Sequence, residues 1–519
     1  MIKQNTFYKI ILPLLAVVAI TGISCKKTLY EPPITSTYGK AFWTSQKGVE
    51  QATLGMYGQL RSSLRSSGSF FINGDLASGF FIPGSDQWNY QTFTASNNPA
   101  YNFSYTPYLE QDLQDWSRFY RIIAQANLIL QNVPKMPANL FTSEAVRNGY
   151  IAEALFIRAY TYFYMIRIWG DPVFVNQTFD DIDYGNIPPI ARTPESIVLD
   201  TCINNLKKAA GYTSFSGGDI SKNLRCNKGS ISALLAHIYA WKHDYTNAHL
   251  YCQEVITKGG YTLEPMATYT NIWKGQASNE SIFELQMKYN ANDPNFNGGG
   301  EWAEAQFDFF GTFIKQDAGF DTDKGNCWMS PDGGTVDDFY DATLDTRYNT
   351  VWKHIASANG DPDGYVLLKY TEFKYQKPDI RAQPYINNNL VLFRLADIIL
   401  LDAEALASAG KLNEAQLALA KTEDRAGAIS YLDPANQGKD EMLLEITRER
   451  GRELVGEGAW YYDLIRTQET QHWLEYVGYP VTDGRLTKTQ KGYYWPLNMG
   501  ALFPQNTLLT QNTYWATHR

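Results

Sequence analysis

The chain has few of the residues from which catalytic and metal sites are usually built. Of its 519 residues only 6 are histidine and 5 are cysteine. The histidines show no HExxH spacing, no GxSxG element is present, and no two cysteines form a CxxC pair. The sequence therefore gives no sign of a zinc protease, a serine hydrolase or a thiol redox centre, and we expect no enzymatic activity.

A concentrated basic region is also lacking. The formal net charge is -9, and the longest basic cluster is the pair Lys26-Lys27. Because nucleic-acid binding depends on a basic face that neutralises phosphates, this composition argues against it.

Long hydrophobic runs are rare, and the most informative one lies at the N-terminus. Lys3 and Lys9 flank the start of an apolar run from Ile10 to Ile20, which has signal-peptide length and is too short to span a bilayer. The small residues Gly22 and Ser24 follow, directly before Cys25. We predict a lipoprotein signal peptide at residues 1–24 and a lipid anchor on Cys25 that holds the protein to a membrane. The alternative is an ordinary signal peptide cleaved nearby.

The remaining cysteines leave two alternatives. Two disulfides are compatible with an exported protein, but several of these residues lie in apolar helical patterns, where buried free thiols are at least as common. The four residues are Cys202, Cys226, Cys252 and Cys327.

Aromatic residues, in contrast, are abundant: 35 Tyr, 26 Phe and 13 Trp. Many are concentrated in the stretch AEALFIRAYTYFYMIRIWGDPVFV at residues 152–175. Because Glu153, Arg158 and Arg167 interrupt it, the stretch cannot span a membrane. A helix that is apolar nearly all round predicts an interior element packed on several sides.

Helical periodicity recurs along the chain. It is clear in residues 45–64 and 112–133, and two helix-turn-helix pairs, at 228–257 and 391–427, have the small-residue spacing of tetratricopeptide units. The predicted fold is mainly α, a tetratricopeptide-like helical superhelix with long irregular, loop-rich insertions. Those insertions are residues 69–107, rich in aromatics, Gly, Asn, Ser and Pro, and residues 261–389, rich in Gly, Asp, Asn, Trp and Phe. In the second insertion the aromatic density argues against disorder and favours a functional surface.

Eight motifs, in order along the chain, resemble one family, the SusD/RagB-like outer-membrane lipoproteins of the Bacteroidetes. They are GVEQATLGMYGQL, FYRIIAQANLILQNVP, the 152–175 stretch, NKGSISALLAHIYAWKHDYTNA, FRLADIILLDAEAL, EDRAG, ITRERGRELVGEGAWYYDLIR and YYWPLNMGALFPQNTLLTQNTYW.

The resemblance implies one domain over residues 25–519, with the scaffold in 45–64, 112–257 and 391–466 and the ligand face in 69–107 and 261–389. It also implies a protein at the cell surface that caps a SusC-like TonB-dependent transporter and captures an oligosaccharide, without catalysis or a required cofactor. Some relatives serve peptide uptake, so a peptide ligand is an alternative. A helical glycoside hydrolase is a further one, which would need two carboxylates across a groove.

Sugar binding requires an aromatic ring for the C–H face of a pyranose and planar polar groups for its hydroxyls. The first irregular insertion offers such a set, with Trp88 as the leading candidate and a Trp folded back into the protein as the alternative. The second insertion supplies further aromatics, of which at least one is expected to face Trp88. The predicted ligand residues are Asp75, Gln87, Trp88, Asn89, Tyr90, Tyr289, Trp302 and Trp328.

Two charged stretches have simpler interpretations. DTDKGN at Asp321 resembles half of a calcium loop, but the later ligands are out of register, so a solvated turn is favoured and no metal is predicted. In EITRERGRELVGEG, i,i+3 spacing predicts the ion pairs Glu445–Arg448, Glu449–Arg452 and Arg450–Glu453. Gly451 and Gly456 depart from the family pattern there and put the continuity of that helix in doubt, since a mid-helix glycine costs roughly 1 kcal/mol against alanine.

Overall fold

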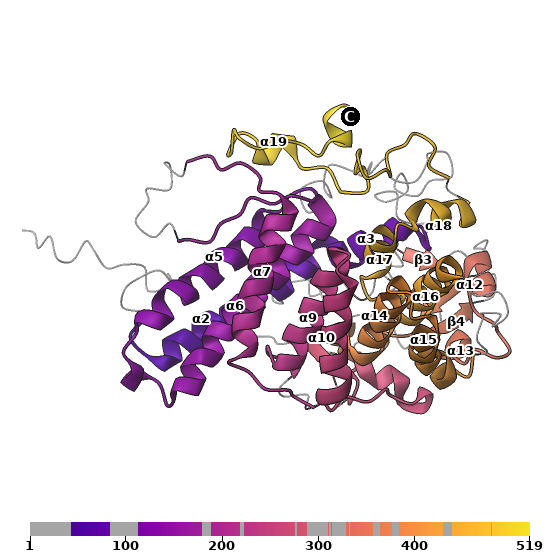
Figure 1. The fold of residues 1–519 in the computed structure, drawn as a ribbon, viewed down its shortest axis with the longest axis horizontal. Helices are drawn as coiled ribbons and strands as arrows, with labels where there is room; N and C mark the ends of the chain where they lie inside the picture. The colour runs from indigo at the N-terminus through magenta and orange to yellow at the C-terminus, as the bar shows by residue number, and fades with distance from the viewer. Residues whose placement is uncertain are drawn as a thin grey trace, which may run out of the picture.

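Helices form the scaffold of the molecule, seen in a computed structural model (Figure 1). The structure describes residues 43–83, 113–178, 188–217, 219, 223–275, 278–287, 310, 313, 329–331, 333–355, 364–375, 384–428, 438–478 and 480–518.

The first half of the scaffold packs four helices side by side. They are α2 (Gln46–Arg65), α5 (Ser117–Asn132), α6 (Glu144–Trp169) and α7 (Glu195–Ala210), and each contacts the next in this order. Serine hydroxyls define two of their starts, because Ser45 accepts the backbone N–H of Gly48 and Ser143 that of Val146. These helices match the periodicity of the sequence.

The second half repeats a helix-turn-helix unit. The first pair is α9 (Lys228–Trp241) with α10 (Tyr245–Lys258), and the second is α14 (Leu395–Ser408) with α15 (Leu412–Ala426). α10 packs on α14, so the two pairs stack, and α16 (Lys439–Leu454) continues the stack against α14 and α15. The tetratricopeptide-like superhelix predicted from the sequence is therefore confirmed. The short helices that follow are α17 (Trp460–Thr467), α18 (Thr470–Tyr476), α19 (Met499–Leu502) and η9 (Tyr514–Ala516).

Short strands occur only in pairs among the described residues, and all pairs are antiparallel. β2 (Ser281–Leu285) pairs with β8 (Leu390–Arg394), which brings both ends of the second irregular insertion together beside α14. The others are β1 (Phe81–Pro83) with β3 (Met329–Pro331), β4 (Trp352–Ile355) with β5 (Gly364–Leu367), and β6 (Phe373–Tyr375) with β7 (Pro384–Ile386). Short helices accompany them: α3 (Ser69–Gly74), η2 (Leu76–Ser78), η6 (Met266–Trp273), α12 (Gly333–Phe339) and α13 (Arg347–Val351).

The aromatic-rich stretch at 152–175 is interior, as its composition predicts. In α6 every residue from Tyr150 to Ile166 is buried, and Trp169 is fully buried near the helix end. Its two arginines find different partners: Arg158 donates to Asn127 Oδ1 at 2.6 Å, whereas the Arg167 guanidinium lies over the rings of Phe163 and Tyr462 at 4.7 and 4.4 Å. The helix ends at Gly170, whose positive φ of 72° suits glycine.

Within the described ranges no helix is long and apolar enough to cross a bilayer. Cys202, Cys226 and Cys252 are free thiols there, so of the two alternatives, disulfides or free thiols, the second holds for these three residues. The predicted signal peptide, Cys25 and Cys327 lie outside the described residues.

Candidate functional site

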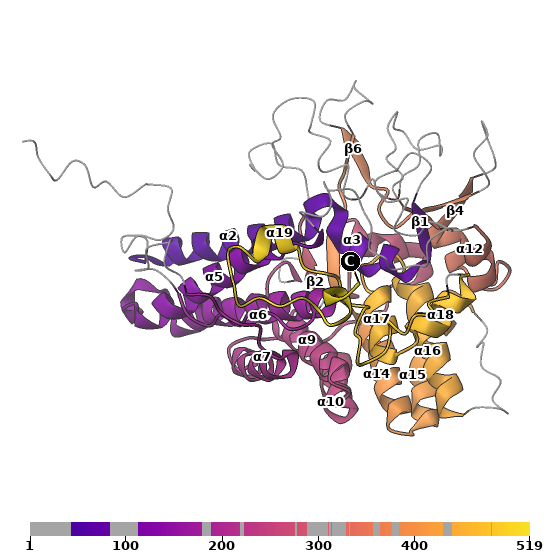
Figure 2. The ribbon, with the colours of Figure 1, turned by 90° about the horizontal axis from the view of Figure 1, so that it is seen from above.

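Three strand pairs lie on one side of the helical scaffold and form what we call the strand-pair face: β1–β3, β4–β5 and β6–β7. Figure 2 shows β1, β4 and β6 on the same side of the molecule. β3 also contacts β5, so two of the pairs adjoin. In the β1–β3 pair Pro83 lies opposite Met329. Residues 246 positions apart in the chain thus meet at this face, and each comes from one of the two irregular insertions.

An aromatic cluster lies beneath these strands. Phe71 of α3 contacts Phe313 edge to face with ring centroids 4.8 Å apart, and Phe313 also contacts Phe81 of β1 at 5.4 Å. Tyr370 stacks on Phe310 at 4.8 Å. All five rings are buried, so they anchor the face and do not themselves form its surface.

A polar cluster lies at the edge of the face, where α12 and α13 meet the β4–β5 pair. The Tyr348 hydroxyl donates to Asp337 Oδ1 at 2.8 Å and lies 2.6 Å from the Tyr365 hydroxyl, which also donates to Asp337. The His354 ring packs beside Tyr365 with centroids 5.2 Å apart. Burial and the hydrogen bond to Asp337 raise the pKa of Tyr365, so its hydroxyl stays a neutral donor. Asp337 and His354 are exposed, and the cluster combines an accessible carboxylate with aromatic rings.

Sequence reasoning missed this polar cluster. Its residues come from DDFYDATLDTRYNT and the β4–β5 pair, and only the fold brings Asp337, Tyr348 and Tyr365 together. The one available signal was the Asp and Tyr content of that segment.

Asp75, predicted as a ligand residue, is instead interior, and its assignment to the ligand surface is a correction. It is 1% exposed, and its carboxylate accepts the backbone N–H groups of Gly456 at 3.1 Å and Gly458 at 2.7 Å. Burial raises the pKa of Asp75 to about 8, against the opposing effect of these two donors. Residues 69–81 carry apolar residues that pack into the core as α3, η2 and the start of β1, so the irregular composition there marks tight turns and not an exposed loop. Asp75 joins this segment to the turn after α16.

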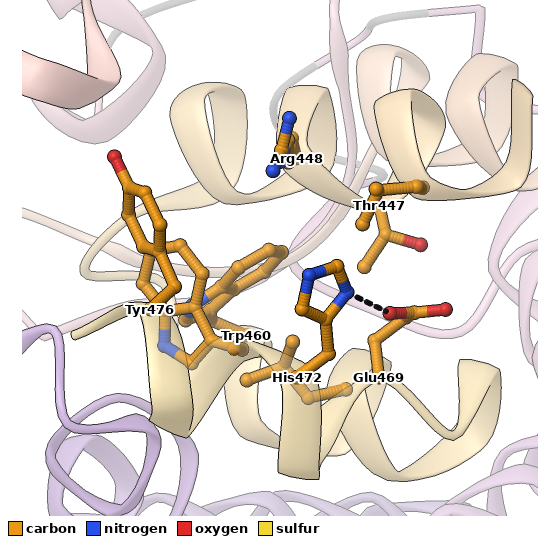
Figure 3. Close-up of a pocket in the computed structure, with 9 residues that line it drawn as sticks. Thr447, Arg448, Trp460, Glu469, His472 and Tyr476 are labelled. Carbon is orange, nitrogen blue, oxygen red and sulfur yellow. Dashed lines mark hydrogen bonds and ion pairs between the residues drawn. The ribbon is translucent and has the colours of Figure 1, made fainter. Parts of the chain in front are cut away.

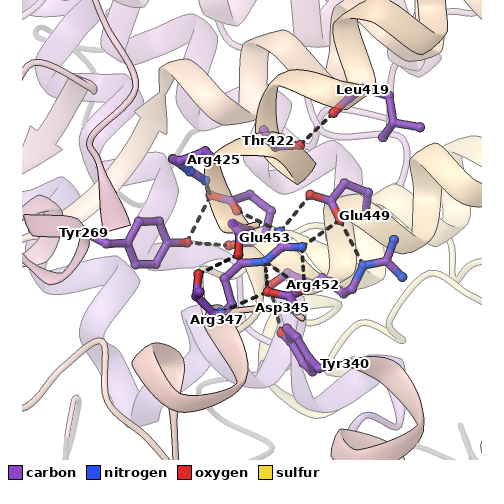
Figure 4. A network of polar contacts seen from close by, with 12 residues as sticks. Tyr269, Tyr340, Asp345, Arg347, Leu419, Thr422, Arg425, Glu449, Arg452 and Glu453 are labelled. Carbon is purple, nitrogen blue, oxygen red and sulfur yellow. Dashed lines mark hydrogen bonds and ion pairs between the residues drawn. The ribbon is translucent and has the colours of Figure 1, made fainter. Parts of the chain in front are cut away.

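A buried ion-pair network holds the scaffold together behind the strand-pair face (Figure 4). Fully buried Arg347 of α13 bonds Asp345 at 2.8 Å and, through one amino group, Glu449 at 2.7 Å and Glu453 at 3.0 Å. Arg394, at the end of β8, bonds Glu453 and Glu280 at 2.6 Å each. Burial alone would raise the pKa of Glu453, but Arg425, Arg394 and Arg347 hold it well below its usual value. These carboxylates are saturated with structural partners, which leaves none of them placed as a catalytic acid.

Two of the three ion pairs predicted within α16 are wrong. Glu449 does bond Arg452, at 2.9 Å. Glu445, however, pairs with Arg452, and Arg450 reaches Asp397 at 2.7 Å and Asp463 at 2.8 Å on other helices. The i,i+3 rule applies to exposed helix surfaces, whereas α16 is buried between neighbours that offer better-aligned carboxylates.

Gly451 does not interrupt α16. A Cβ atom there would lie 2.7 Å from Cη2 of Trp460 and 2.9 Å from Cζ of Phe339, so glycine permits close packing of these rings on the helix. Gly456 follows the helix end with a φ of 71°. The helix is continuous to Leu454, so the departure from the family pattern at Gly451 does not break it. The packing of Trp460 and Phe339 explains why glycine occurs there.

The other predicted ligand residues lie outside the described residues: Gln87, Trp88, Asn89, Tyr90, Tyr289, Trp302 and Trp328. The calcium-like stretch at Asp321 lies outside them as well. In the part of the chain that is described, no group of three or more His, Cys, Asp or Glu side chains could hold a metal ion.

Comparison with known proteins gives consistent matches. A family model described as "SusD family" matches residues 253–515, about half of the chain, and another, described as "Starch-binding associating with outer membrane", matches residues 80–240. SusD-like protein P38 of Formosa agariphila is 25% identical over 538 residues, which cover 94% of this chain and 95% of the relative. A SusD-like protein of Bacteroides ovatus is 24% identical over 497 residues, covering 89% and 83%.

Solved structures agree in fold. A SusD homolog from Bacteroides thetaiotaomicron superposes with a TM-score of 0.71 at 23% identity, covering 91% of this chain and 99% of that one. A structure described as a laminarin binding SusD-like protein has a TM-score of 0.70 at 22% identity, covering 90% and 99%. At these identities the likeness establishes the architecture.

Proposed function

This chain belongs to the SusD family, and on that premise we propose that it is a cell-surface lipoprotein that binds oligosaccharides. In this proposal Cys25 carries the lipid anchor in the outer membrane, and a SusC-like TonB-dependent transporter imports the captured glycan. The protein acts by binding alone, with neither a catalytic step nor a required cofactor; calcium remains a minor alternative at Asp321.

The observation that carries the proposal is the β1–β3 pairing. Pro83 lies opposite Met329; in the sequence Gln87, Trp88, Asn89 and Tyr90 follow Pro83 within seven residues, and Trp328 directly precedes Met329. An extended chain reaches at most about 3.6 Å per residue, so covalent connection keeps Trp88 within roughly 18 Å of Pro83. This supports a shared ligand surface formed by both insertions, to which Tyr289 and Trp302 would add aromatic faces.

The polar cluster of Asp337, Tyr348 and Tyr365 supports the same location. Asp337 Oδ1 is occupied by the two tyrosines, which fix the carboxylate, while the side chain remains exposed at the edge of the strand-pair face. A fixed carboxylate beside aromatic rings suits the hydroxyls of a sugar. We include Asp337 in the proposed ligand surface.

The direct test measures binding of the purified protein to a glycan panel that starts with laminarin, by affinity electrophoresis and calorimetry. Four variants are compared with wild type: Trp88→Ala, Trp302→Ala, Trp328→Ala and Asp337→Ala. Since one stacking ring is worth about 0.5–1.5 kcal/mol beyond its area, at least one Trp variant should weaken binding three-fold or more. Asp200→Ala on α7, exposed and remote in the helical scaffold, is the control. Wild-type affinity in all four variants would refute this ligand surface.

Two alternatives are tested on the same sample. A peptide pool, titrated beside the glycans, identifies a peptide-uptake protein of the same family if peptides bind and glycans do not. Release of reducing sugar from a bound polysaccharide would identify a glycoside hydrolase instead. Co-purification of the intact lipoprotein with a transporter from outer membranes tests the transporter partnership.

A further inference from the structure

Two hollows of very different size lie on the surface of the second half of the scaffold. The hollow between α16, α17 and α18 is nearly filled by the side chains around it, among them Arg448, Trp460 and Tyr476 (Figure 3). It leaves about 10 Å³ of open space, which holds one water molecule at most. The groove between α10 and α15, with α14 as its floor, leaves about 340 Å³. Of the two, the groove is large enough to receive part of another molecule.

The groove lies on the side of the molecule opposite the strand-pair face. Figure 2 shows α10, α14 and α15 on one side and β1, β4 and β6 on the other. The side chains that line the groove include no Trp, Tyr or Phe. A sugar that stacks on an aromatic ring therefore finds no platform here, and the groove is separate from the proposed glycan surface.

The groove has an apolar floor. Leu406 of α14 and Ala418 of α15 are buried and belong to a small hydrophobic core that α14, α15 and α16 share. Leu417, which also lines the groove, is 70% exposed, more than any other large hydrophobic side chain in the part of the chain that the structure describes. Burial of this leucine against another protein would remove its apolar surface from water and favour association.

Glu414 and Lys421 flank Leu417 on the exposed side of α15. They lie three residues before it and four residues after it, so the three side chains share one face of the helix. Both charged side chains are exposed, and neither makes a hydrogen bond or an ion pair with a residue that the structure describes. The carboxylate of Asp402 on the groove floor, in contrast, already bonds His249 Nδ1 at 2.6 Å. Glu414 and Lys421 are therefore the charges that another molecule can pair with.

The order of these side chains is self-complementary. When two copies of α15 pack antiparallel about a two-fold axis midway between Leu417 and Ala418, Glu414 of each copy faces Lys421 of the other, because the two lie equally far from the axis. Leu417 then faces Ala418, whose small side chain leaves space for it. A two-fold contact uses the same patch on both copies, so it forms two ion pairs and two apolar contacts. In a parallel arrangement like charges would meet instead.

We propose that the protein forms a two-fold symmetric dimer through this face of α15. Leu417 of each copy packs against Ala418 of the other beside the groove, and two Glu414–Lys421 ion pairs fix the antiparallel register. Because one helix and its groove form a small contact, the Kd of the dimer should be about 10–100 µM. The strand-pair faces of both copies stay open, since the contact lies on the opposite side of the molecule.

Charge exchange tests the register. Sedimentation velocity of the full-length protein, purified in detergent and diluted from about 200 µM to about 1 µM, measures the dimer. Glu414→Lys and Lys421→Glu each place like charges opposite one another at both contacts and should raise the Kd at least tenfold. The double variant Glu414→Lys/Lys421→Glu restores both pairs, so its Kd should lie within about threefold of wild type. Lys208→Glu, at an exposed lysine of α7, is the matched control and should dimerise like wild type.

Cross-linking locates the two-fold axis. Leu417→Cys brings two thiols close together at the axis, so mild oxidation of membranes that carry the full-length protein should give a disulfide-linked dimer. Ile197→Cys on α7, where the isoleucine is 55% exposed, is the matched control and should give no more dimer than wild type, which carries the native cysteines. Leu417→Asp should abolish the dimer, and circular dichroism of each variant checks that it is folded.

Four results would each overturn the proposal: a monomer at every concentration, a double variant as weak as the single ones, wild-type dimerisation of Glu414→Lys, or equal cross-linking of Leu417→Cys and Ile197→Cys. A different protein that binds the monomeric chain and is lost in Leu417→Asp would also overturn it and assign the groove to that partner. Glycan binding by Leu417→Asp should equal that of wild type, so the failure of the dimer is distinguishable from the failure of the proposed function.

Discussion

Helices α6 and α16 are both buried, but they are buried in opposite ways. Of the 19 buried residues of α6 only Glu153 and Arg158 are charged, and the rest pack mostly as aromatic and aliphatic side chains. Of the 10 buried residues of α16 five are charged: Glu445, Glu449, Arg450, Arg452 and Glu453. Apolar packing is non-directional, whereas each buried charge needs a partner in a defined position.

The difference explains how the irregular segments are attached to the scaffold. The carboxylates of α16 receive Arg347 from α13, Arg394 from β8 and Arg425 from α15. One helix thereby fixes three elements that are distant in sequence. A buried ion pair contributes little net stability compared with apolar packing, but removing one partner leaves the other charge unpaired and is costly. We therefore expect α16 to be sensitive to single charge removals, and α6 to depend on the volume of its side chains.

The largest effect is expected for Arg347→Met. The change leaves Asp345, Glu449 and Glu453 without their shared fully buried cation, which should lower the free energy of unfolding by about 3–5 kcal/mol. Urea denaturation followed by circular dichroism measures it. Arg121→Met, at an exposed arginine of α5, is the control and should cost less than about 0.5 kcal/mol. Equal effects at the two positions would contradict the comparison.

The next largest effect is the pH dependence of the free energy of unfolding that Asp75 causes. Asp75 follows α3 and accepts hydrogen bonds from the turn after α16. Because burial raises the pKa of Asp75 to about 8, above its ordinary 3.8, the native state binds the proton more tightly than the unfolded state. This contribution is complete below the unfolded pKa and is lost as pH rises toward 8. As pH rises, the free energy of unfolding of wild type should therefore fall relative to that of Asp75→Asn. The fall should be up to about 1.4 kcal/mol per pH unit, or about 2–3 kcal/mol between pH 5 and pH 7.

The measurement for Asp75 is a series of urea titrations of both proteins across that range. Burial lowers the pKa of neighbouring Lys369 to about 8, so its titration falls largely above the range used. A difference that is constant with pH would mean that Asp75 is ionised throughout and that the two backbone donors outweigh burial.

A glycine pair sharpens the comparison at a smaller scale. Gly451→Ala in α16 places a methyl group against Trp460 and Phe339, and overpacking of about 1–3 kcal/mol should outweigh the helix gain of about 1 kcal/mol. Gly149→Ala in α6 meets no atom within 4 Å and should stabilise by about 0.5–1 kcal/mol. Thermal unfolding of the two variants should shift in opposite directions, and shifts of the same sign would show that α16 can relax around the methyl group.

The contrast also separates what could be predicted from the sequence from what could not. Periodicity and composition predict the interior position of residues 152–175 and the stacked helix pairs, because a helix face that packs in the core carries apolar residues at helical spacing. The partners of Arg450 and Glu445 do not, because they depend on which carboxylates the fold brings close. Asp75 was misassigned for the same reason. A Gly- and Ser-rich segment resembles a loop, and the contacts of Asp75 with Gly456 and Gly458 join residues that are far apart in the sequence.

The candidate site follows the same division. Aromatic and Asp content predicts two irregular insertions, but residues 69–81 of the first are largely helical and buried. It did not indicate that Asp337, Tyr348 and Tyr365 converge, or that Arg448, unlike Arg450 and Arg452, makes no ion pair with a described residue. Both depend on strand pairing and helix packing, which the local sequence pattern does not record.

The smallest effect is expected at Arg448 itself. Since its guanidinium makes no ion pair with a described residue and remains half-buried, Arg448→Gln should change the free energy of unfolding by less than about 0.5 kcal/mol. Arg450→Gln, two positions along the same helix, removes the partner of Asp397 and Asp463 and should cost several times more. Urea titration of the two variants tests this directly. If Arg448→Gln were as destabilising as Arg450→Gln, the contribution of an arginine on α16 would not depend on its buried carboxylate partners, and the contrast with α6 would be lost.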